Sequence, residues 1–472
     1  MPNHNVRLLV GLTILLTGCE VGPDYRQPQL DLPAIDDYSK AATEDVDKFV
    51  CSEWWTVFQD SVLDTLEKQA IEHNADLKQA MANIEIAMEE AGISMSNLLP
   101  SVKTDMSGGK THPSRRMSAT ATDSVDYLGT IGISYEVDFF GKYRRANEAA
   151  MAQLLSSKAA REVVMLAVTS NVAKTYFSIR ALDAKLAVAT RTLKTREESY
   201  SVYKDRFATG YCTELDCLRL EAEMASIKTT VLDLEIALAK AETSLKALIG
   251  CSPREIISQK VTRGASIERL KIPCNVSNNI PSDLITRRPD VLQAECQLIA
   301  ANAAIGETMA LHFPSFSLTA AYGFESKLLS NLFASNANMW KFLSGISLPI
   351  FNGGKISAMT RKAEINYQKA LLSYGGAVKT AFREVLDSLI SRRKNSEIVV
   401  SRTRQVNALK KSYNLALSQK ESGLIGLLDL LDVERGLLSA EMELVAALQN
   451  HLNSVVDLCK ALGGGWKQNS LL

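Results

Sequence analysis

The sequence predicts a mainly α fold with a β-barrel portion, organised as a tandem repeat of helix, hairpin and two long helices. Three observations support this fold class. The same residues recur at a fixed spacing through most of the chain, two very long stretches contain no proline, and four short segments alternate apolar with polar residues. A chain of 472 residues with 46% hydrophobic content is large enough for an extensive core.

The chain repeats itself in one register. Pro100 recurs as Pro314, 214 residues later, and after the first loop the spacing becomes 213, which relates Gly141 to Gly354. Chance does not hold a register over so long a stretch, so we interpret the chain as a tandem duplication.

The repeat sets the expected boundaries. We place a first repeat at 61–252 and a second at 286–465, joined by a linker at 253–285. A signal peptide at 1–18, an anchor and extended segment at 19–60, and a tail at 466–472 complete the chain. The expected strands are 101–111, 128–140, 315–325 and 342–352, and the expected long helices are 142–209, 213–249, 355–422 and 426–462.

Two stretches lack the strongest helix breaker. No proline lies between Pro113 and Pro253, and none follows Pro349. Within these stretches Ala, Leu, Glu, Lys and Arg dominate, and apolar residues recur three and four apart, which is typical of packed coiled-coil helices. Gly210 and Gly423 are the natural turn points, each a candidate helix C-cap. A helix from 142 to the first of these turns would be about 100 Å long.

Four segments have the period of two that strands require. Thr130–Phe139 and Ser315–Phe324 alternate aromatic or β-branched residues with small or polar ones. This pattern fits a half-buried soluble sheet, and it equally fits a membrane barrel with its apolar face toward lipid. Four strands cannot close a barrel, because about eight is the smallest number known, so several protomers must contribute. Two, three or four copies would each close one.

The amino terminus resembles a lipoprotein export signal. Arg7 precedes the apolar run Leu8–Leu16, and small residues lie directly before Cys19. In such signals the cysteine receives acyl chains and becomes the first residue, so we expect a lipid on Cys19; an ordinary signal peptide is the alternative. Glu20 in place of an aspartate favours the outer membrane. Beyond residue 19 no run of about 18 apolar residues occurs, so strands must make any membrane crossing.

Composition excludes several functions. Lys+Arg and Asp+Glu are both 53, so no net charge favours nucleic acid. The five histidines are scattered, and no metal-ligand cluster or nucleophile motif is present, so we expect no enzyme, no metal and no other cofactor. Seven cysteines follow Cys19, and among them Cys212 and Cys217 are close enough in sequence for a local disulfide; small buried thiols are the alternative.

Several motifs carry a family resemblance that spans nearly all of the mature chain. The matching segments are Cys19–Tyr25 with Pro28, Trp54–Trp55 with Phe58, Tyr135–Gly141, Arg287–Val291, Phe313–Phe316, Leu348–Gly354 and Leu462–Trp466. In this order they resemble the TolC-like outer-membrane efflux family. The resemblance is strongest to its lipoprotein (OprM/NodT-like) branch, the outer-membrane factors of resistance-nodulation-division pumps.

The resemblance implies an architecture and partners. It implies a homotrimer with a twelve-stranded barrel in the outer membrane and a twelve-helix tunnel in the periplasm. Such channels export small molecules passively and dock an inner-membrane pump through a periplasmic adaptor protein. The turns at Gly210 and Gly423 would form the periplasmic tip and contact the adaptor. Pro349, Gly141 and Gly354 are expected where barrel strands bend into tunnel helices, since proline cannot donate to a strand ladder.

The resemblance also implies a gate at the tip. The family motif places a leucine ring at Leu428, an aspartate ring at Asp432 and an arginine contact at Arg435. Asp429 is an extra acidic residue, and Asp216 corresponds to it in the first repeat, so both are possible additional gate residues. Carboxylates near a symmetry axis attract cations, and a leucine ring excludes water. The alternative is that all of them are ordinary positions on a solvated helix.

Two rival functions stay open at this point. Within the channel class, the chain could be the exit duct of a type I protein secretion system, although the lipobox favours small-molecule efflux. From a different class, it could be a lipid-anchored periplasmic coiled-coil scaffold with a small soluble sheet. The alternating aromatic faces of two repeated hairpins favour a channel.

Overall fold

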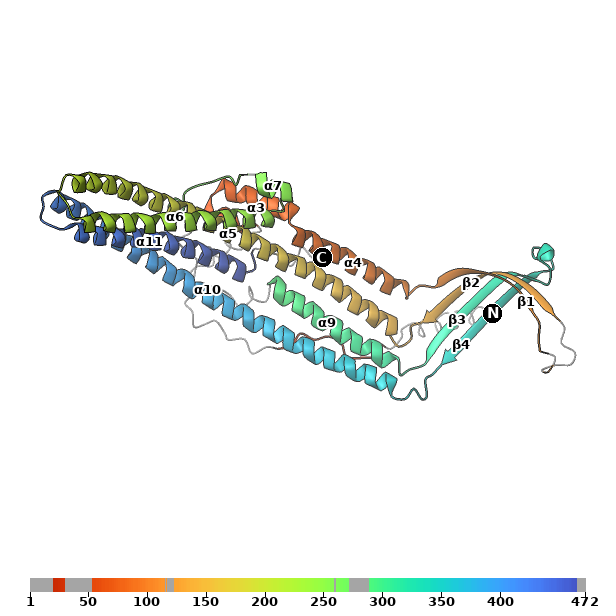
Figure 1. The fold of residues 1–472 in the computed structure, drawn as a ribbon. Coiled ribbons are helices and arrows are strands. Elements are labelled where there is room, and N and C mark those ends of the chain that lie inside the picture. Colours follow the sequence, from red (N-terminus) through yellow and green to blue (C-terminus); the bar gives the residue numbers. More distant parts are fainter. Residues whose placement is uncertain are drawn as a thin grey trace. The chain divides into compact units, whose positions relative to one another are not determined.

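The computed structural model describes residues 20–29, 53–114, 116, 123–258, 260–270 and 288–464. These residues form a mainly helical fold with one β-sheet, the fold class that the sequence predicts (Figure 1). The chain divides into two compact units. The first consists of Met1–Leu30, Asn83–Lys158 and Gln293–Gly375, and the second consists of Asp31–Ala82, Ala159–Leu292 and Gly376–Leu472.

The duplication is visible in the lengths of the helices. Three pairs of helices have equal lengths of 22, 67 and 35 residues: α4 (Ala75–Ser96) with α9 (Pro289–Ala310), α5 (Lys142–Ala208) with α10 (Lys355–Glu421), and α6 (Glu214–Leu248) with α11 (Leu427–Ala461). The helices expected at 213–249 and 426–462 are one residue shorter at each end, because their outermost residues are caps with non-helical backbone angles. The shorter helical segments are η2 (Trp54–Phe58), α3 (Ser61–His73), α7 (Pro253–Ser258) and η3 (Leu329–Asn331).

The first unit contains a four-stranded antiparallel sheet in the order β1-β2-β3-β4. Its strands are β1 (Ser101–Thr111), β2 (Ser124–Val137), β3 (Ser315–Ser326) and β4 (Asn338–Ser347). Both hairpins have the same register: Ser101 lies opposite Ser134, and their repeat equivalents Ser315 and Ser347 lie opposite each other. The two repeats meet along β2 and β3 in the middle of the sheet.

Two of the expected strands are displaced. The segment expected at 128–140 begins earlier, at Ser124, and ends at Val137. The segment expected at 342–352 is wrong at both ends, because β4 runs from Asn338 to Ser347. Pro349 therefore lies after the strand, in the connection to α10, where its missing backbone N–H removes no ladder bond.

The expected linker at 253–285 also differs from the structure. Its first residues form the short helix α7, and residues 260–270 lie in irregular structure within the second unit. The signal peptide at 1–18, Cys19, most of the remaining linker and the tail at 466–472 lie outside the described residues.

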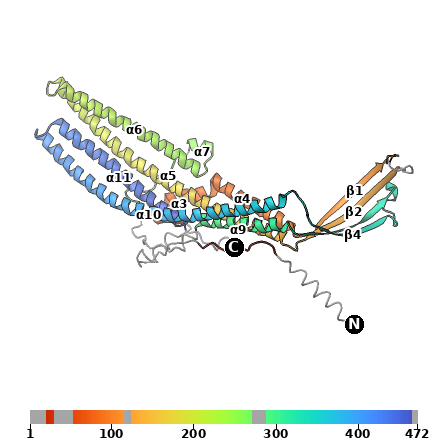
Figure 2. The same cartoon turned by 90° about the horizontal axis from the view of Figure 1, so that it is seen from below.

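The second unit has an aromatic core beneath η2 and α3. Trp54 and Phe58 of η2 are buried, and the Phe58 ring packs edge-on against Phe177 of α5 at a centroid distance of 4.9 Å. Burial of these large side chains supplies much of the attachment of the amino-terminal helices, at about 2–3 kcal/mol per fully buried ring. Figure 2 shows the paired long helices, α5 with α6 and α10 with α11, in this unit.

Among the residues that the structure describes, no helix is both long enough and apolar enough to cross a membrane.

Candidate functional site

Both long helix pairs in the second unit turn at a glycine. Gly210 follows α5 with a φ of +75°, and Gly423 follows α10 with a φ of +74°, a conformation that side chains with a Cβ rarely adopt. At each turn the glycine N–H and the next N–H close the helix: Gly210 N donates to Phe207 O at 3.0 Å and Tyr211 N donates to Arg206 O at 2.8 Å. This pair of bonds is the Schellman motif, and Gly423 repeats it.

We call the two turns and the adjoining helix ends the tip. A small apolar cluster ties them together: Leu220 of α6 packs with Leu427 and Leu431 of α11, and Tyr200 and Tyr203 of α5 cover the cluster. The structure thus brings the two predicted turns to one end of the second unit, as Figures 1 and 2 both show.

The acidic residues Asp216 and Asp429 have a local structural role. Asp216 accepts a hydrogen bond from the Thr213 hydroxyl at 2.7 Å, and Thr213 Oγ1 accepts from Asp216 N, which forms a capping box at the start of α6. Asp429 Oδ2 accepts from Gly426 N at 3.0 Å in the equivalent place on α11. The Asp216 carboxylate also accepts from Thr213 N at 3.4 Å, so both carboxylates bind the backbone N–H of the residue that caps their helix. Their place in a gate stays a prediction.

The three predicted gate residues lie on one side of α11. Leu428 is 49% exposed, and the Asp432 side chain is 82% exposed. Arg435 lies between two carboxylates, with its Nη2 3.5 Å from Asp432 Oδ1 and its Nε 3.6 Å from Glu223 Oε1 of α6. Arg435 thus links α11 to α6, and sequence reasoning did not identify Glu223 as its partner.

Next to these exposed contacts lies a buried ion pair that the sequence did not reveal. Arg196 Nη2 of α5 is 3.0 Å from Glu434 Oε2 of α11, and their side chains are only 3% and 12% exposed. Desolvation raises the pKa of Glu434 in spite of the attraction of Arg196, and the nearby Glu223 raises it further. The burial of this carboxylate therefore costs more than its partner returns.

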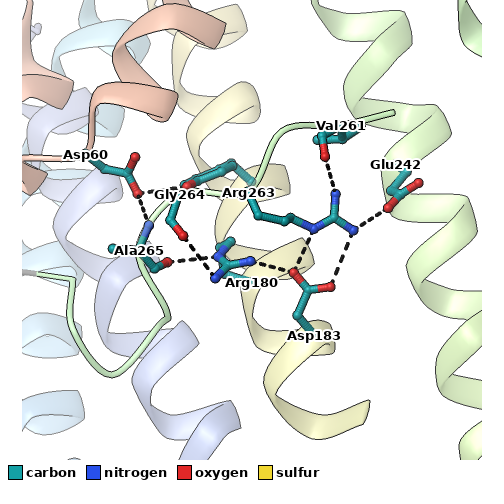
Figure 3. Close-up of polar contacts among 9 residues, drawn as sticks. Asp60, Arg180, Asp183, Glu242, Val261, Arg263, Gly264 and Ala265 are labelled. Carbon is teal, nitrogen blue, oxygen red and sulfur yellow. Dashed lines mark hydrogen bonds and ion pairs between the residues drawn. The ribbon is translucent and has the colours of Figure 1, made fainter. Parts of the chain in front are cut away.

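A second polar network fixes the segment 260–270 against α5 and α6 (Figure 3). Asp60 is its centre: Oδ1 caps α3 by accepting from Val62 N at 2.9 Å, and Oδ2 accepts from the Tyr176 hydroxyl at 2.8 Å and from Ala265 N at 3.3 Å. Hydrogen bonding to Asp60 and, above all, burial raise the pKa of the Tyr176 phenol. Gly264 has no room for a side chain, since an added Cβ would lie 2.4 Å from the Tyr176 oxygen.

Two arginines extend the network shown in Figure 3. Arg180 donates from Nε to Ala265 O at 2.9 Å and from Nη1 to Asp183 at 2.7 Å. Arg263 reaches Asp183 at 2.8 Å and also binds Glu242 of α6. The network therefore joins α3, α5 and α6 at the end of the second unit away from the tip. The spacing of Arg180 and Asp183 indicates a helical pair, but nothing in the sequence indicates their distant partners.

In the first unit, the segment Glu20–Gln29 is held by a buried arginine. Arg145 of α5 is 4% exposed; its Nη2 is 2.6 Å from Asp24 Oδ1, its Nη1 is 2.7 Å from Glu148 Oε2, and its Nε is 3.8 Å from Glu20 Oε1. Asn302 of α9 donates to the carbonyl of Pro23 at 2.8 Å. The chain immediately after the expected lipid site is thus bound to α5 and α9. Cys19 itself lies outside the described residues.

The residues expected at the strand-to-helix bends lie in those connections. Gly141 and Gly354 directly precede α5 and α10, with φ of +78° and +83°, and their carbonyls accept the first helical hydrogen bonds from Arg145 N and Ala358 N. Across the described ranges, no group of three or more His, Cys, Asp or Glu side chains is arranged to hold a metal ion.

The comparison with protein families decides the class of the molecule. The family model described as outer membrane efflux protein matches residues 66–251 and again 280–464, one match for each repeat. The chain belongs to this family. Its two matched segments coincide with the duplicated halves of the molecule, from α3 to α6 and from α9 to α11.

Individual relatives agree with this assignment. The efflux protein is 30% identical over 461 residues to the probable outer membrane lipoprotein SilC of Salmonella typhimurium, with 97% of this chain and 98% of that one covered. It is 32% identical to the toluene efflux pump outer membrane protein TtgC of Pseudomonas putida, with 97% and 94% covered. The crystal structure of the open state of the MtrE outer membrane channel of Neisseria gonorrhoeae has a TM-score of 0.85 at 30% identity and covers 95% of this chain and 99% of that one.

The efflux protein is therefore an outer-membrane channel component of an efflux system. This function replaces the scaffold interpretation, because the family consists of channels. It also favours efflux over the exit duct of a protein secretion system.

Proposed function

We propose that three copies of this chain form a passive exit duct for small molecules, closed at the tip by Leu428, Asp432 and Arg435. The observation that carries the proposal is the position of Arg435, whose guanidinium lies within 3.6 Å of Glu223 and within 3.5 Å of Asp432. Arg435 joins α11, which carries the candidate constriction, to α6 of the neighbouring helix pair.

Spacing and exposure support the constriction. Leu428, Asp432 and Arg435 are four and three residues apart, so they share one face of α11. In an isolated protomer the Leu428 side chain is half-exposed and the Asp432 side chain is 82% exposed, so both are open to contact with another copy. Around a threefold axis they would form an apolar ring that excludes water beside an anionic ring that attracts cations.

The ion pairs at the tip are weak enough for a gate that opens. Exposed ion pairs such as Arg435–Asp432 contribute at most about 1 kcal/mol each and weaken as salt increases. A few such contacts per protomer can be exchanged when another protein binds. By contrast, the Arg196–Glu434 pair on the adjacent side of α11 is buried, so it is not available for such an exchange.

Partners and anchoring complete the proposal. We infer a twelve-stranded barrel from three copies of the four-stranded sheet, with acyl chains on Cys19 fixing each protomer to the outer membrane. A periplasmic adaptor would contact the turns at Gly210 and Gly423 and connect the duct to an inner-membrane pump. The pump would select the cargo. TtgC, named a toluene efflux pump protein, guides the choice of ligands for tests, and SilC, named a lipoprotein, supports the lipid anchor.

The decisive experiment is single-channel conductance of the purified full-length protein in planar bilayers. We expect the wild type to be closed most of the time at low salt. Arg435→Ala should raise the open probability at least several-fold, and Glu223→Gln should have an effect of the same direction, because each variant removes the link between α11 and α6.

Arg402→Ala is the matched control. Arg402 pairs with Glu443 between α10 and α11, both side chains are partly exposed, and Glu443 lies eight residues beyond Arg435 along α11, away from the tip. A wild-type channel that conducts while Arg435→Ala and Arg402→Ala behave alike would contradict the gate and leave the channel intact. A protein that inserts in bilayers but never conducts in any variant would contradict the duct itself.

A further inference from the structure

The first-repeat turn of the tip contains two cysteines whose sulfur atoms face each other. Cys212 Sγ and Cys217 Sγ are 4.0 Å apart, and both donate to the same backbone oxygen, Tyr203 O, at 3.2 and 3.5 Å. Both side chains are partly exposed, whereas Cys296 and Cys459 are buried. Cys212 and Cys217 are not joined by a disulfide in this structure.

The two cysteines occupy a defined pair of helix positions. Thr213 is the N-cap of α6, so Cys212 directly precedes the cap and Cys217 is the fourth residue of the helix. These are the two positions that form a hydrophobic staple, in which side chains on either side of the cap pack together and fix how the chain enters the helix.

The second repeat shows the ordinary form of the same staple. Gly426 is the N-cap of α11, and the equivalent positions hold Ile425 and Leu430, both partly buried. They lie 213 residues after Cys212 and Cys217, the spacing that relates the two repeats. The first repeat therefore carries a thiol pair where the second carries an aliphatic pair, within the same backbone turn.

We propose that Cys212 and Cys217 form a disulfide in the exported protein, which replaces the hydrophobic staple of α6 by a covalent one. The turn holds the sulfur atoms 4.0 Å apart, so they must approach by about 2 Å to form the bond. Loss of the two weak S–H donors leaves nothing unpaired, because Tyr203 lies within α5, where its carbonyl takes part in the helical ladder.

The chemistry is a thiol–disulfide exchange with an oxidising protein disulfide of the periplasm. A thiolate of the pair attacks one sulfur of the oxidant and forms a mixed disulfide. The second thiolate then attacks the first cysteine and releases the oxidant as a dithiol. Cys212 and Cys217 together lose two protons and two electrons, and the oxidant gains two thiols. Desolvation, followed by the hydrogen bond and charge of Cys212, raises the pKa of Cys217, which lowers the fraction of its reactive thiolate.

The disulfide would make the two turns of the tip unequal. It would close a covalent ring around the capping box of Thr213 and Asp216 and hold the start of α6 in one conformation. The turn before α11 would keep only van der Waals contacts between Ile425 and Leu430. This last step rests on the gate proposed above: the disulfide would hold the start of α6, which carries Glu223, in place while α11 moves.

The test uses the full-length protein exported to the outer membrane and purified without reductant. The protein is denatured, alkylated with iodoacetamide and digested with trypsin, which releases residues 207–219 as one peptide with both cysteines. From the unreduced protein we expect this peptide without alkyl groups and with a mass two hydrogen atoms below that of the dithiol form. After reduction and alkylation we expect it to carry two alkyl groups. A doubly alkylated peptide from the unreduced protein would overturn the proposal. A peptide linked to another cysteine, or two thiols holding a metal ion in the native mass spectrum, would also overturn it.

A matched variant separates redox chemistry from packing. Cys212→Ile/Cys217→Leu copies the staple of the second repeat and cannot be oxidised. We expect dithiothreitol to increase hydrogen exchange of residues 207–219 at least several-fold in the wild type and to leave the double variant unchanged. Equal responses would show that the wild-type turn has no covalent bond. Because neither readout uses conductance, failure of the disulfide and failure of the gate are distinguishable.

Discussion

Arg196 and Glu434 form an ion pair across the interface of α5 and α11, with Nη2 and Oε2 3.0 Å apart and both side chains almost fully buried. Arg196 Nε has no hydrogen-bond partner among the described residues. The pair is therefore desolvated but incompletely satisfied, and its two members should respond differently to substitution.

We expect Arg196→Ala to destabilise the protein by about 3 kcal/mol, because it leaves the Glu434 carboxylate buried and unpaired. Glu434→Gln should cost less than about 1 kcal/mol or even stabilise, since burial already raises the pKa of Glu434. Thermal unfolding in one detergent at neutral pH compares the variants, with Arg402→Ala at an exposed pair as the control. A Glu434→Gln variant as unstable as Arg196→Ala would show that the pair is net stabilising.

Glu67 of α3 should make stability depend on pH. The residue is fully buried, and neither carboxylate oxygen has a hydrogen-bond partner in the part of the chain that the structure describes. Burial, followed by the charge of Asp64, holds its pKa well above the usual value. The folded state therefore retains a proton that the unfolded chain releases near about pH 4.3.

The sign of this effect follows from the raised pKa. The stability associated with Glu67 is complete below about pH 4.3 and is lost as the pH rises toward the folded pKa, by about 1.4 kcal/mol for each pH unit that separates the folded and unfolded pKa. We expect Glu67→Gln to gain thermal stability relative to the wild type as the pH rises above about 4.3, the pKa of the unfolded chain. Glu72→Gln, at an exposed position of the same helix, should show no such gain. Parallel pH profiles of Glu67→Gln and wild type would refute the assignment.

Arg145 should control how firmly the segment after the lipid site is held. Arg145→Met removes the partners of Asp24 and Glu20. We expect trypsin to cut after the exposed Arg26 roughly tenfold faster, corresponding to about 1.4 kcal/mol of lost local stability. The control is Arg144→Met, whose arginine binds Asp138 instead. Cleavage at the wild-type rate would mean that the contacts of Asn302 and Val21 are sufficient to hold the segment.

The repeat also specifies how neighbouring copies should pair. Ser134 of β2 lies opposite Thr319 of β3, where the two repeats of one chain meet. The repeat spacings of 213 and 214 carry this pair to Ser347 of β4 and Asp105 of β1, which are the outer strands and are exposed along nearly their whole length. In a closed ring of copies, Ser347 should thus face Asp105 of the next chain.

Cysteine crosslinking tests this register. Opposite residues of antiparallel strands have Cβ atoms about 5 Å apart, close enough for a disulfide. We expect Ser347→Cys/Asp105→Cys to give covalent chains of up to the full ring on non-reducing gels after mild oxidation. Ser347→Cys/Thr104→Cys should not, because a shift of one residue moves the side chain to the other face. Crosslinking of the second variant alone would establish a different register.

Much of the fold is encoded locally, and the exceptions have a physical reason. Long proline-free stretches determine the long helices, and the constant spacing predicts that both hairpins are built alike. The end of β4 at Ser347 is less predictable, because alternation continues past the residue where pairing stops. The charge of Asp216 and Asp429 predicts a possible place in the gate, and the structure adds that both carboxylates accept from the N-cap N–H of their helices, contacts that the sequence pattern alone did not reveal. Asp60, Arg180 and Arg145 also have distant partners, which lie 84 to 205 residues away in the sequence. No local pattern could reveal those partners.

The equal registers of the two hairpins have an evolutionary consequence. An ancestral chain of one repeat could have built the same sheet from twice as many subunits, every one of them identical. Fusion of two such chains freed each half from that identity. One half now carries a thiol pair at its turn and the other an aliphatic pair, and only the second half has an aspartate and an arginine at the positions of Asp432 and Arg435, where the first half has Arg219 and Ala222. In a ring of identical one-repeat subunits, by contrast, every substitution would appear in every repeat.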